Sequence, residues 1–244
     1  MVKKRMDQLL VEKGLASTRE RAQRLILAGK VLVNDKPQTK PGHFIEEQGV
    51  IRIRGEDHPF VSRGGLKLQA ALDHFKLEVS GRVALDIGAS TGGFTHVLLL
   101  RGAIRVHAID VGHSQLDWKI RSDSRVIVKE KTNARYLCFE EVGEKVGLIV
   151  MDVSFISLDK ILPAMVQFSG AETDWITLIK PQFEVGKDKV GKGGIITSDI
   201  DRKESVERVT CFGESLGLVQ LGLIECPVLG TQGNREFLAH WKLK

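Results

Sequence analysis

The sequence has few cysteines, and their spacing fits neither a disulfide framework nor a zinc site. The three cysteines, Cys138, Cys211 and Cys226, are far apart and odd in number, and no Cys-x-x-Cys motif occurs. This spacing predicts reduced cysteines in the core of the protein. The seven histidines are also scattered, without a His-x-x-x-His pair, so we expect no bound metal.

Long apolar runs are absent as well. No stretch approaches the roughly 18 to 20 apolar residues that cross a bilayer, and the basic residues 1–5 lead into Asp7 and Gln8 rather than an apolar signal core. We therefore expect a soluble, cytoplasmic protein that does not bind membranes. The 244 residues, 42% of them hydrophobic, can form a core and allow a small domain joined to a medium one.

Positive charge is concentrated near the amino terminus. Residues 1–40 contain ten lysines and arginines against four acids, whereas the remaining residues contain 26 basic and 27 acidic side chains. A basic segment on a nearly neutral body predicts a polyanionic partner. Aromatic residues are scarce in this part of the chain, where Phe44 is the only one among residues 1–54, which argues against a stacking platform for single-stranded bases.

The basic segment has the pattern of two helices and a hairpin. Residues 6–15 predict a short helix, and Ser17-Thr-Arg-Glu20 predicts a capping box for a second helix that ends at Gly29. Residues 31–33 then predict a strand that turns at Asn34-Asp35.

This pattern resembles the S4 RNA-binding domain over residues 5–54. The matching motifs are Asp7-x-x-Leu10, Ser17-Thr-Arg-x-x-Ala22 and Ile26-x-x-Gly29-x-Val31-x-Val33-Asn34. Arg19, Arg21 and Arg24 lie off the apolar stripe of the second helix, at a spacing that suits successive phosphates. The residues expected to bind RNA are Lys4, Arg5, Arg19, Arg21, Arg24, Lys30 and, beyond this module, Arg63.

A second domain is expected at residues 60–244, after a polar turn at 55–59 that completes the first domain, residues 1–59. Short apolar strands alternate with helical stretches there, at residues 83–86, 104–110, 126–128, 148–152, 176–180, 218–225 and 237–241. This alternation predicts an α/β fold with a doubly wound, mostly parallel sheet, preceded by a small α+β domain.

A glycine-rich loop, Asp86-Ile-Gly-Ala-Ser-Thr-Gly-Gly-Phe94, directly follows the first of these strands. Its glycines would let the backbone approach a ligand closely, and the carboxylate of Asp86 suits a ribose or an amino-acid group. Ser90 stands where the dinucleotide fingerprint has its second glycine, so the loop favours S-adenosylmethionine over NAD. An ordinary strand-to-helix turn would also use glycine and is the alternative.

Three polar residues end strands, where ligands bind in sheets of this kind. Asp110 follows the glycine loop by about 20 residues, the separation at which an acid meets a ribose hydroxyl pair. Asp152 and Lys180 end two further strands. A lysine at the end of a central apolar strand is costly to charge, which indicates a functional role for Lys180.

The second domain resembles FtsJ-type ribose 2′-O-methyltransferases, and the whole chain is similar to the TlyA (haemolysin-A-like) family. The matching stretches are Val61-Ser-Arg-Gly-Gly-Leu-Lys67, Asp86 to Phe94, Asp110-Val-Gly-His-Ser-Gln-Leu116, Thr132-Asn-Ala-Arg135, Asp152-Val-Ser-Phe-Ile-Ser-Leu158, Lys180-Pro-Gln-Phe-Glu-Val-Gly186 and Gly233-Asn-Arg-Glu236. The resemblance implies a Rossmann-like methyltransferase sheet, S-adenosylmethionine as cofactor and ribosomal RNA or a ribosomal subunit as partner. It also implies 2′-O-methylation of a ribose, expected to be a cytidine.

The same resemblance implies a catalytic Lys-Asp-Lys-Glu set at Lys67, Asp152, Lys180 and Glu236. The chain stops eight residues after Glu236, so it is similar to the short form of the family, for which only the large-subunit cytidine is expected as substrate. The expected cofactor-binding residues are Asp86, Gly88, Ala89, Ser90, Gly92, Gly93, Phe94, Asp110, Val111, Asn133, Ala134 and Asp152.

These residue types suit the reaction. A ribose 2′-hydroxyl is a poor acid, so a base must take its proton as it attacks a methyl group. We expect Lys180 to be that base, because burial and the nearby cation Lys67 disfavour its charged form. Asp152 would orient Lys180 and Glu236 would hold a lysine in position, and no metal is needed.

Two other functions remain open. Asp152-Val-Ser-Phe155 is similar to the Asp-Pro-Pro-Tyr motif of enzymes that methylate base amines, although the prolines are missing. A non-catalytic, ribosome-associated RNA-binding protein is the other alternative.

Overall fold

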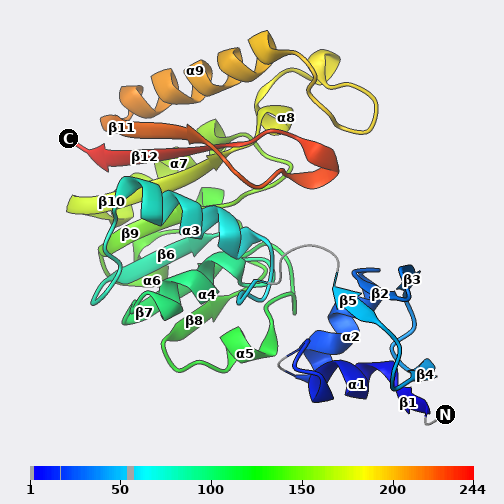
Figure 1. The fold of residues 1–244 in the computed structure, drawn as a ribbon. Helices are drawn as coiled ribbons and strands as arrows, with labels where there is room; N and C mark the ends of the chain where they lie inside the picture. Colours follow the sequence, from blue (N-terminus) through cyan, green and yellow to red (C-terminus); the bar gives the residue numbers. More distant parts are fainter. Residues whose placement is uncertain (1–2, 17, 54–57) are drawn as a thin grey trace. The chain divides into compact units, whose positions relative to one another are not determined.

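The chain folds into two compact units, Met1–Pro59 and Phe60–Lys244 (Figure 1). The computed structural model describes residues 3–16, 18–53 and 58–244. The expected capping residue Ser17 and residues 55–57 of the expected linker lie outside this described part.

The first unit is a small α+β fold around one apolar core. Strand β1 pairs with β4 and strand β2 lies between β3 and β5, all antiparallel. The elements are β1 (Lys3–Arg5), α1 (Met6–Glu12), α2 (Arg19–Leu27), β2 (Val31–Val33), β3 (Lys36–Gln38), β4 (Phe44–Glu46) and β5 (Ile51–Ile53). Leu9 and Leu10 of α1, Leu25 and Ile26 of α2 and Val31 of β2 pack together in the core.

The cap and the turn follow from local chemistry. Helix α2 begins after Thr18, whose side chain accepts a hydrogen bond from the Arg21 amide at 3.1 Å, so the cap lies one residue later than the predicted Ser17. The hairpin turn is confirmed at Asn34 and Asp35, which both have positive φ, 49° and 61°. Two-residue hairpins favour this left-handed geometry because it matches the twist of the strands.

Asp7 joins the two helices of this unit. Its carboxylate is 0% exposed and accepts hydrogen bonds from Arg5 at 3.0 Å, Arg19 at 2.9 Å and Gln23 at 3.0 Å. Hydrogen bonds from Arg5, and then from Gln23 and Arg19, hold the pKa of Asp7 well below its ordinary value, against the opposing effect of burial. A carboxylate with a lowered pKa stabilises the fold above its ordinary pKa and loses this contribution as the pH falls.

We predict that Asp7→Asn destabilises the first unit at pH 7 by about 1.5 to 3 kcal/mol, the range for hydrogen bonds to a charged group. The difference from the unchanged protein should shrink as the pH falls below about 4, where the Asp7 carboxylate of the unfolded chain becomes protonated while that of the folded chain stays charged. Hydrogen exchange of the α1 and α2 amides in the full chain would measure it. An equal difference at pH 7 and pH 3 would contradict the role given to the Asp7 charge.

The second unit contains one seven-stranded sheet in the order β11-β12-β10-β9-β6-β7-β8. Its strands are β6 (Val83–Ile87), β7 (Arg105–Ile109), β8 (Val126–Lys129), β9 (Val146–Met151), β10 (Ser169–Ile179), β11 (Leu218–Glu225) and β12 (Phe237–Leu243). Neighbours from β10 to β8 are parallel, and β12 is antiparallel to β10 and to β11. All seven predicted strands are present, and the predicted doubly wound, mostly parallel sheet is confirmed.

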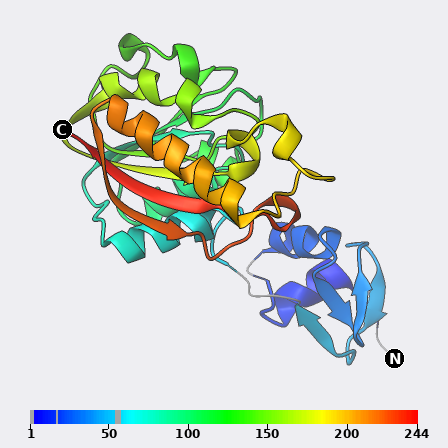
Figure 2. The ribbon, with the colours of Figure 1, turned by 90° about the horizontal axis from the view of Figure 1, so that it is seen from above.

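Helices cover both faces of this sheet (Figures 1 and 2). The helices are α3 (Gly64–Phe75), α4 (Gly93–Leu100), α5 (Trp118–Arg121), α6 (Phe139–Val142), α7 (Leu162–Met165), α8 (Pro181–Glu184) and α9 (Asp199–Ser215), with 3-10 turns at Ala134–Tyr136, Leu158–Lys160, Val166–Phe168, Lys187–Lys189 and Thr231–Gly233. One core contains residues of α3 and α4, and the other contains residues of α7 and α9. Successive strand residues alternate between the two cores, for example Leu148 and Ile149.

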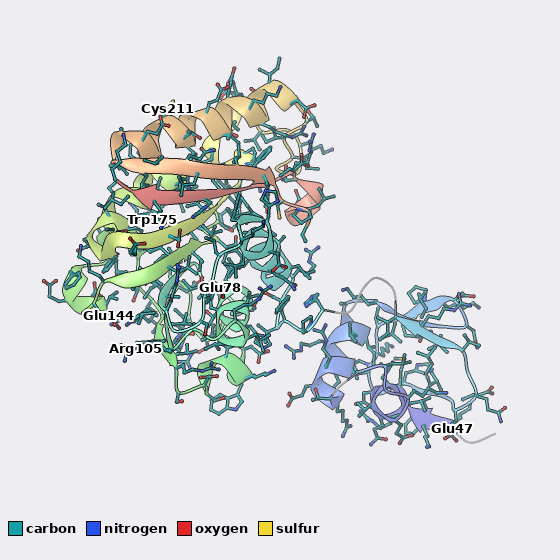
Figure 3. All side chains as sticks on the ribbon, turned by 60° about the vertical axis from the view of Figure 1, so that its left-hand side comes forward. Glu47, Glu78, Arg105, Glu144, Trp175 and Cys211 are labelled. Atoms are coloured by element: carbon teal, nitrogen blue, oxygen red, sulfur yellow. The ribbon has the colours of Figure 1, made fainter. Side chains whose placement is uncertain are left out.

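The prediction for the cysteines was wrong in part. Cys226 is buried, but Cys138 and Cys211 are exposed, and Figure 3 labels Cys211 on α9. Cys211 lies on the side of α9 opposite the buried residues Val206 and Val209, a position that the cysteine spacing alone does not reveal. In the described part of the chain, no helix is both long and apolar enough to span a membrane.

Candidate active site

The candidate site lies at one edge of the large sheet. The parallel strands β6, β7, β9 and β10 all end there, so Gly88, Asp110, Asp152 and Lys180 follow neighbouring strands. Strand β12 starts at the same edge because it is antiparallel to β10, with Phe237 opposite Ile179. Glu236, which precedes β12, therefore lies at the same edge as Lys180.

Two adjoining cavities open here. One, of about 290 Å³, is lined by all four residues of the expected catalytic set and by Arg63. The other, of about 450 Å³, is lined by Asp110, Val111, Asn133 and Ala134. The cavities share four lining residues, Gly88, Ser90, Asp152 and Ser154.

The glycine loop bends sharply between β6 and α4. The amides of Gly88 and Ala89 both donate to the Ile109 carbonyl, at 2.9 and 3.1 Å, and the Ser90 amide donates to Asp110 at 2.7 Å. The expected residues Gly88, Ala89, Ser90, Gly93 and Phe94 line the 290 Å³ cavity. The loop thus forms part of the cavity wall.

The glycines serve mainly to let parts of this protein approach one another. A Cβ on Gly88 would lie 2.6 Å from the Asp152 carbonyl oxygen, and one on Gly93 would lie 2.3 Å from Ser62 Oγ. At Gly92, which lines neither cavity, a Cβ would lie 2.9 Å from Leu116. The expectation that all three allow close approach of a ligand is therefore corrected for Gly92, which packs against the core.

Asp86 does not reach either cavity, contrary to expectation. It is 0% exposed, and Thr95 of α4 donates a hydrogen bond to its Oδ2 at 2.6 Å. Burial, reinforced by the charges of Asp152 and Asp110, raises the pKa of Asp86 to about 7 against the effect of Thr95. Its place directly before the loop suggested a ligand contact, but the packing of α4 encloses it.

Asp110 lies on the wall of the 450 Å³ cavity, as expected. Its two oxygens accept hydrogen bonds from the amides of Ser90 and Gly112, both at 2.7 Å. These bonds fix the carboxylate and leave each oxygen with a further lone pair. Apolar side chains such as Ile109, Ile156 and Ile161 complete this cavity.

Lys180 is held by two acceptors. Its Nζ lies 2.6 Å from Asp152 Oδ1 and donates to Ser154 Oγ at 2.8 Å, and the residue is only 8% exposed. A neutral lysine has two N–H bonds and one lone pair, so these two acceptors would leave the lone pair available for another proton. The sequence analysis missed Ser154, although it lies within the Asp152-Val-Ser-Phe155 motif.

Lys67 of α3 pairs with Glu236 rather than with Asp152. Its Nζ lies 2.5 Å from Glu236 Oε2, and Glu236 is 1% exposed. Gln182 of α8 lies 3.4 Å from the other carboxylate oxygen. A Cβ on Gly230 would lie 2.1 Å from Glu236 Oε1, so Gly230 makes room for this buried pair.

Several residues expected to bind RNA have partners within the first unit. Lys4 pairs with Glu12 and Glu47 at 2.8 and 2.9 Å, and their hydrogen bonds raise the pKa of Lys4 to about 12. Arg5 and Arg19 share Asp7, and Arg21 donates to the His58 carbonyl at 3.1 Å. Arg19, which we expected to face successive phosphates together with Arg21 and Arg24, is directed instead toward the buried Asp7.

Arg63 belongs to the second unit and lines the 290 Å³ cavity. Over residues 58–244, no acid forms an ion pair with it, whereas Lys67 and Lys180 are both paired with acids. Arg24 lies on α2 of the first unit, and Lys30 lies between α2 and β2 of the same unit.

Comparison with known families agrees with this geometry. The FtsJ-like methyltransferase family profile matches residues 60–243 and the S4 domain profile matches residues 4–51. The chain belongs to the FtsJ-like methyltransferase family. The resemblance expected from the sequence is thereby confirmed, and an S4 domain precedes the methyltransferase fold.

Full-length relatives share both domains. The 16S/23S rRNA (cytidine-2′-O)-methyltransferase TlyA of Mycobacterium tuberculosis is 45% identical over 96% of this chain and 87% of its own length. Hemolysin A of Brachyspira hyodysenteriae is 40% identical over 97% of this chain and 99% of its own length. A solved structure from Streptococcus thermophilus, provisionally named a hemolysin, is 42% identical and covers 100% of this chain and 90% of its own, with a TM-score of 0.78.

We predict that Gly88→Ala separates the ends of β6 and β9. The Cβ would meet the Asp152 carbonyl oxygen at 2.6 Å, and the φ of +81° is unfavourable for alanine. Gly143→Ala is the matched control, because its φ is +78° but nothing lies within 4 Å of its Cβ. Urea denaturation should show that Gly88→Ala lowers the free energy of unfolding by about 1 to 3 kcal/mol more than Gly143→Ala does. Equal losses would mean that the close approach of Asp152 is unimportant.

Proposed function

We propose that this FtsJ-like methyltransferase uses S-adenosylmethionine to methylate the 2′-oxygen of a cytidine ribose in ribosomal RNA. The observation that carries the proposal is the position of Lys180, whose Nζ contacts Asp152 and Ser154 on the wall shared by the two cavities. The printed name of the Mycobacterium tuberculosis relative supports the choice of a cytidine 2′-oxygen.

The donor set fits S-adenosylmethionine. Asp110 offers free carboxylate lone pairs for a ribose, apolar residues form the wall beside it for an adenine, and the 450 Å³ volume is in the range of small-molecule sites. We propose that the cofactor lies along Gly88, Ser90, Asp110, Val111, Asn133, Ala134 and Asp152, and reaches Ala89, Gly93 and Phe94. When bound, it supplies an activated methyl group.

The residues of the 290 Å³ cavity would handle the nucleotide. Lys180 accepts the proton of the 2′-hydroxyl. Asp152 and Ser154 accept hydrogen bonds from the two N–H groups of neutral Lys180 and so direct its lone pair toward the hydroxyl. Lys67, fixed by Glu236, presents a cation that holds the ribose or its phosphate. Positioning of the hydroxyl should supply most of the acceleration, since orientation can remove about 7 to 11 kcal/mol of a barrier.

We also propose that the two domains have separate roles. Residues 1–59 bind ribosomal RNA and residues 60–244 carry out methyl transfer, with Arg63 contacting a phosphate from the cavity wall. A ribosomal RNA substrate would place the protein in the cytoplasm. Base-amine methylation is the second candidate, because Asp152-Val-Ser-Phe155 forms part of the site and Phe155 is 91% exposed.

We predict that Lys180→Ala lowers turnover at least about a hundredfold, while affinity for S-adenosylmethionine changes only a few fold, as expected for a group that acts in the transition state. Lys145→Ala is the control, since Lys145 donates to the Ser169 carbonyl and lines neither cavity.

Tritium transfer from labelled S-adenosylmethionine to RNA of each ribosomal subunit would measure turnover. The product should keep its methyl group on the sugar after cleavage of the glycosidic bond. A methyl group on the base would overturn the ribose assignment and favour base-amine methylation. Absence of transfer to any RNA would favour a non-catalytic RNA-binding protein.

We predict that neutralising Arg19, Arg21 and Arg24 together reduces the slope of RNA affinity against salt by roughly one to two, because each phosphate contact releases counterions and Arg19 is engaged by Asp7. A triple variant of Arg101, Arg105 and Lys203, which line neither cavity, controls for net charge. Titration of an rRNA fragment at several salt concentrations would measure the slope. A slope equal to that of the control would remove α2 from the RNA-binding surface.

A further inference from the structure

A buried carboxylate next to the site has no part in the chemistry described so far. Glu184 ends α8 and is 2% exposed. Its Oε1 accepts a hydrogen bond from the Leu158 amide at 2.9 Å, and its Oε2 accepts one from Ser157 Oγ at 2.5 Å. Arg208 of α9 lies 3.0 Å from Oε2. A buried carboxylate is costly without partners of this kind, so its contacts are specific.

The segment that Glu184 holds also carries the partners of Lys180. Asp152 and Ser154, which contact Lys180 Nζ, lie at the start of residues 152–158, and Ser157 and Leu158 lie at the end. Lys180 and Glu184 flank a single helical turn. This turn therefore contacts the segment at two points: Lys180 bonds to Asp152 and Ser154, and Glu184 bonds to Ser157 and Leu158.

The backbone between these two points is strained. Phe155 has a φ of +64°, in the left-handed region that is unfavourable for residues with a side chain. Its ring lies 5.1 Å from that of Phe183, between Lys180 and Glu184 on α8. Such a conformation persists only where the surroundings fix it, and the Glu184 bonds fix the side of the segment away from Lys180.

We propose that Glu184 is a positioning residue for methyl transfer, because it fixes residues 153–158 against α8 and so keeps Ser154 Oγ on Lys180 Nζ. This inference rests on the proposed role of Lys180. The inference predicts that a change at Glu184 lowers kcat and leaves binding of RNA and cofactor unchanged, since Glu184 lines neither cavity of the site.

Four variants of the full chain separate this role from a general effect on folding. Glu184→Ala removes all of the bonds, and Glu184→Gln keeps an oxygen for the Leu158 amide but loses the charge. Arg208→Ala removes the exposed partner of Glu184, which also donates to Ser157 Oγ at 3.3 Å, and leaves the bonds from Ser157 and Leu158 to Glu184 in place. Glu144→Ala is the matched control, because Glu144 also accepts two side chains, Arg105 at 2.7 Å and His107 at 2.9 Å, but precedes β9 at the opposite edge of the sheet (Figure 3).

The measurements are kcat, KM for RNA, calorimetric affinity for S-adenosylmethionine and thermal unfolding. Glu184→Ala should lower kcat by about ten- to a hundredfold, the effect of a small misplacement of reacting groups, with KM and cofactor affinity within about threefold. Glu184→Gln should restore part of kcat, whereas Arg208→Ala and Glu144→Ala should stay close to the unchanged enzyme.

A kcat for folded Glu184→Ala within about threefold of that of Glu144→Ala would overturn the inference, as would a loss confined to KM or cofactor affinity. If Glu184→Ala does not fold, Ser157→Ala removes one bond to the same carboxylate, and an unchanged kcat in that variant would overturn it equally. Lys180→Ala is assayed in parallel. Activity of Lys180→Ala would reject the proposed base itself, whereas an inactive Lys180→Ala beside a fully active Glu184→Ala would reject the positioning role alone.

Discussion

The pairing register of β10 with β12 is the constraint on which the site depends. Because Phe237 lies opposite Ile179 in an antiparallel pair, the residues Glu236 and Lys180 leave the sheet at the same edge. The parallel register of β9 with β10 brings Asp152 to that edge as well. A slip of one residue would exchange the faces of every side chain in the strand. The two buried apolar cores prevent it, since β9, β10 and β12 each bury alternate residues in different cores.

The sequence predicted the elements well and their partners poorly. All seven strands of the large sheet and the turn at Asn34 follow from local apolar patterns and from the backbone needs of a tight turn. Partners far apart in the chain leave no such trace. Lys67 and Glu236, separated by 169 positions, were suggested together only by family resemblance, and the pairing of Arg19 with Asp7 was missed. The burial of Asp86 was also missed, because it depends on how α4 packs.

Two buried acids have pKa values that are shifted in opposite directions, although burial raises the pKa of both. Asp7 is surrounded by donors, so its charge stabilises the first unit at neutral pH. Asp86 has Thr95 as its side-chain donor, and burial dominates, which raises its pKa to about 7. A raised carboxyl pKa means that ionisation opposes folding, at a cost that begins above the ordinary pKa near 4 and grows until about pH 7. A fold that retains such a residue under its glycine loop gains the Thr95 bond, which joins the end of β6 to α4.

Helix α8 connects the parts of the site that the sheet alone does not fix. Pro181 at its first position sets the turn directly after Lys180, Gln182 approaches Glu236 at 3.4 Å, and Phe183 packs against Phe155. Glu184 then holds the far side of the segment that carries Asp152 and Ser154. One helical turn thus sets the relative position of both lysine–carboxylate pairs. Arg208 of α9 also contacts the carboxylate of Glu184 at 3.0 Å, so α9 packs beside the turn that carries Lys180 and Glu184.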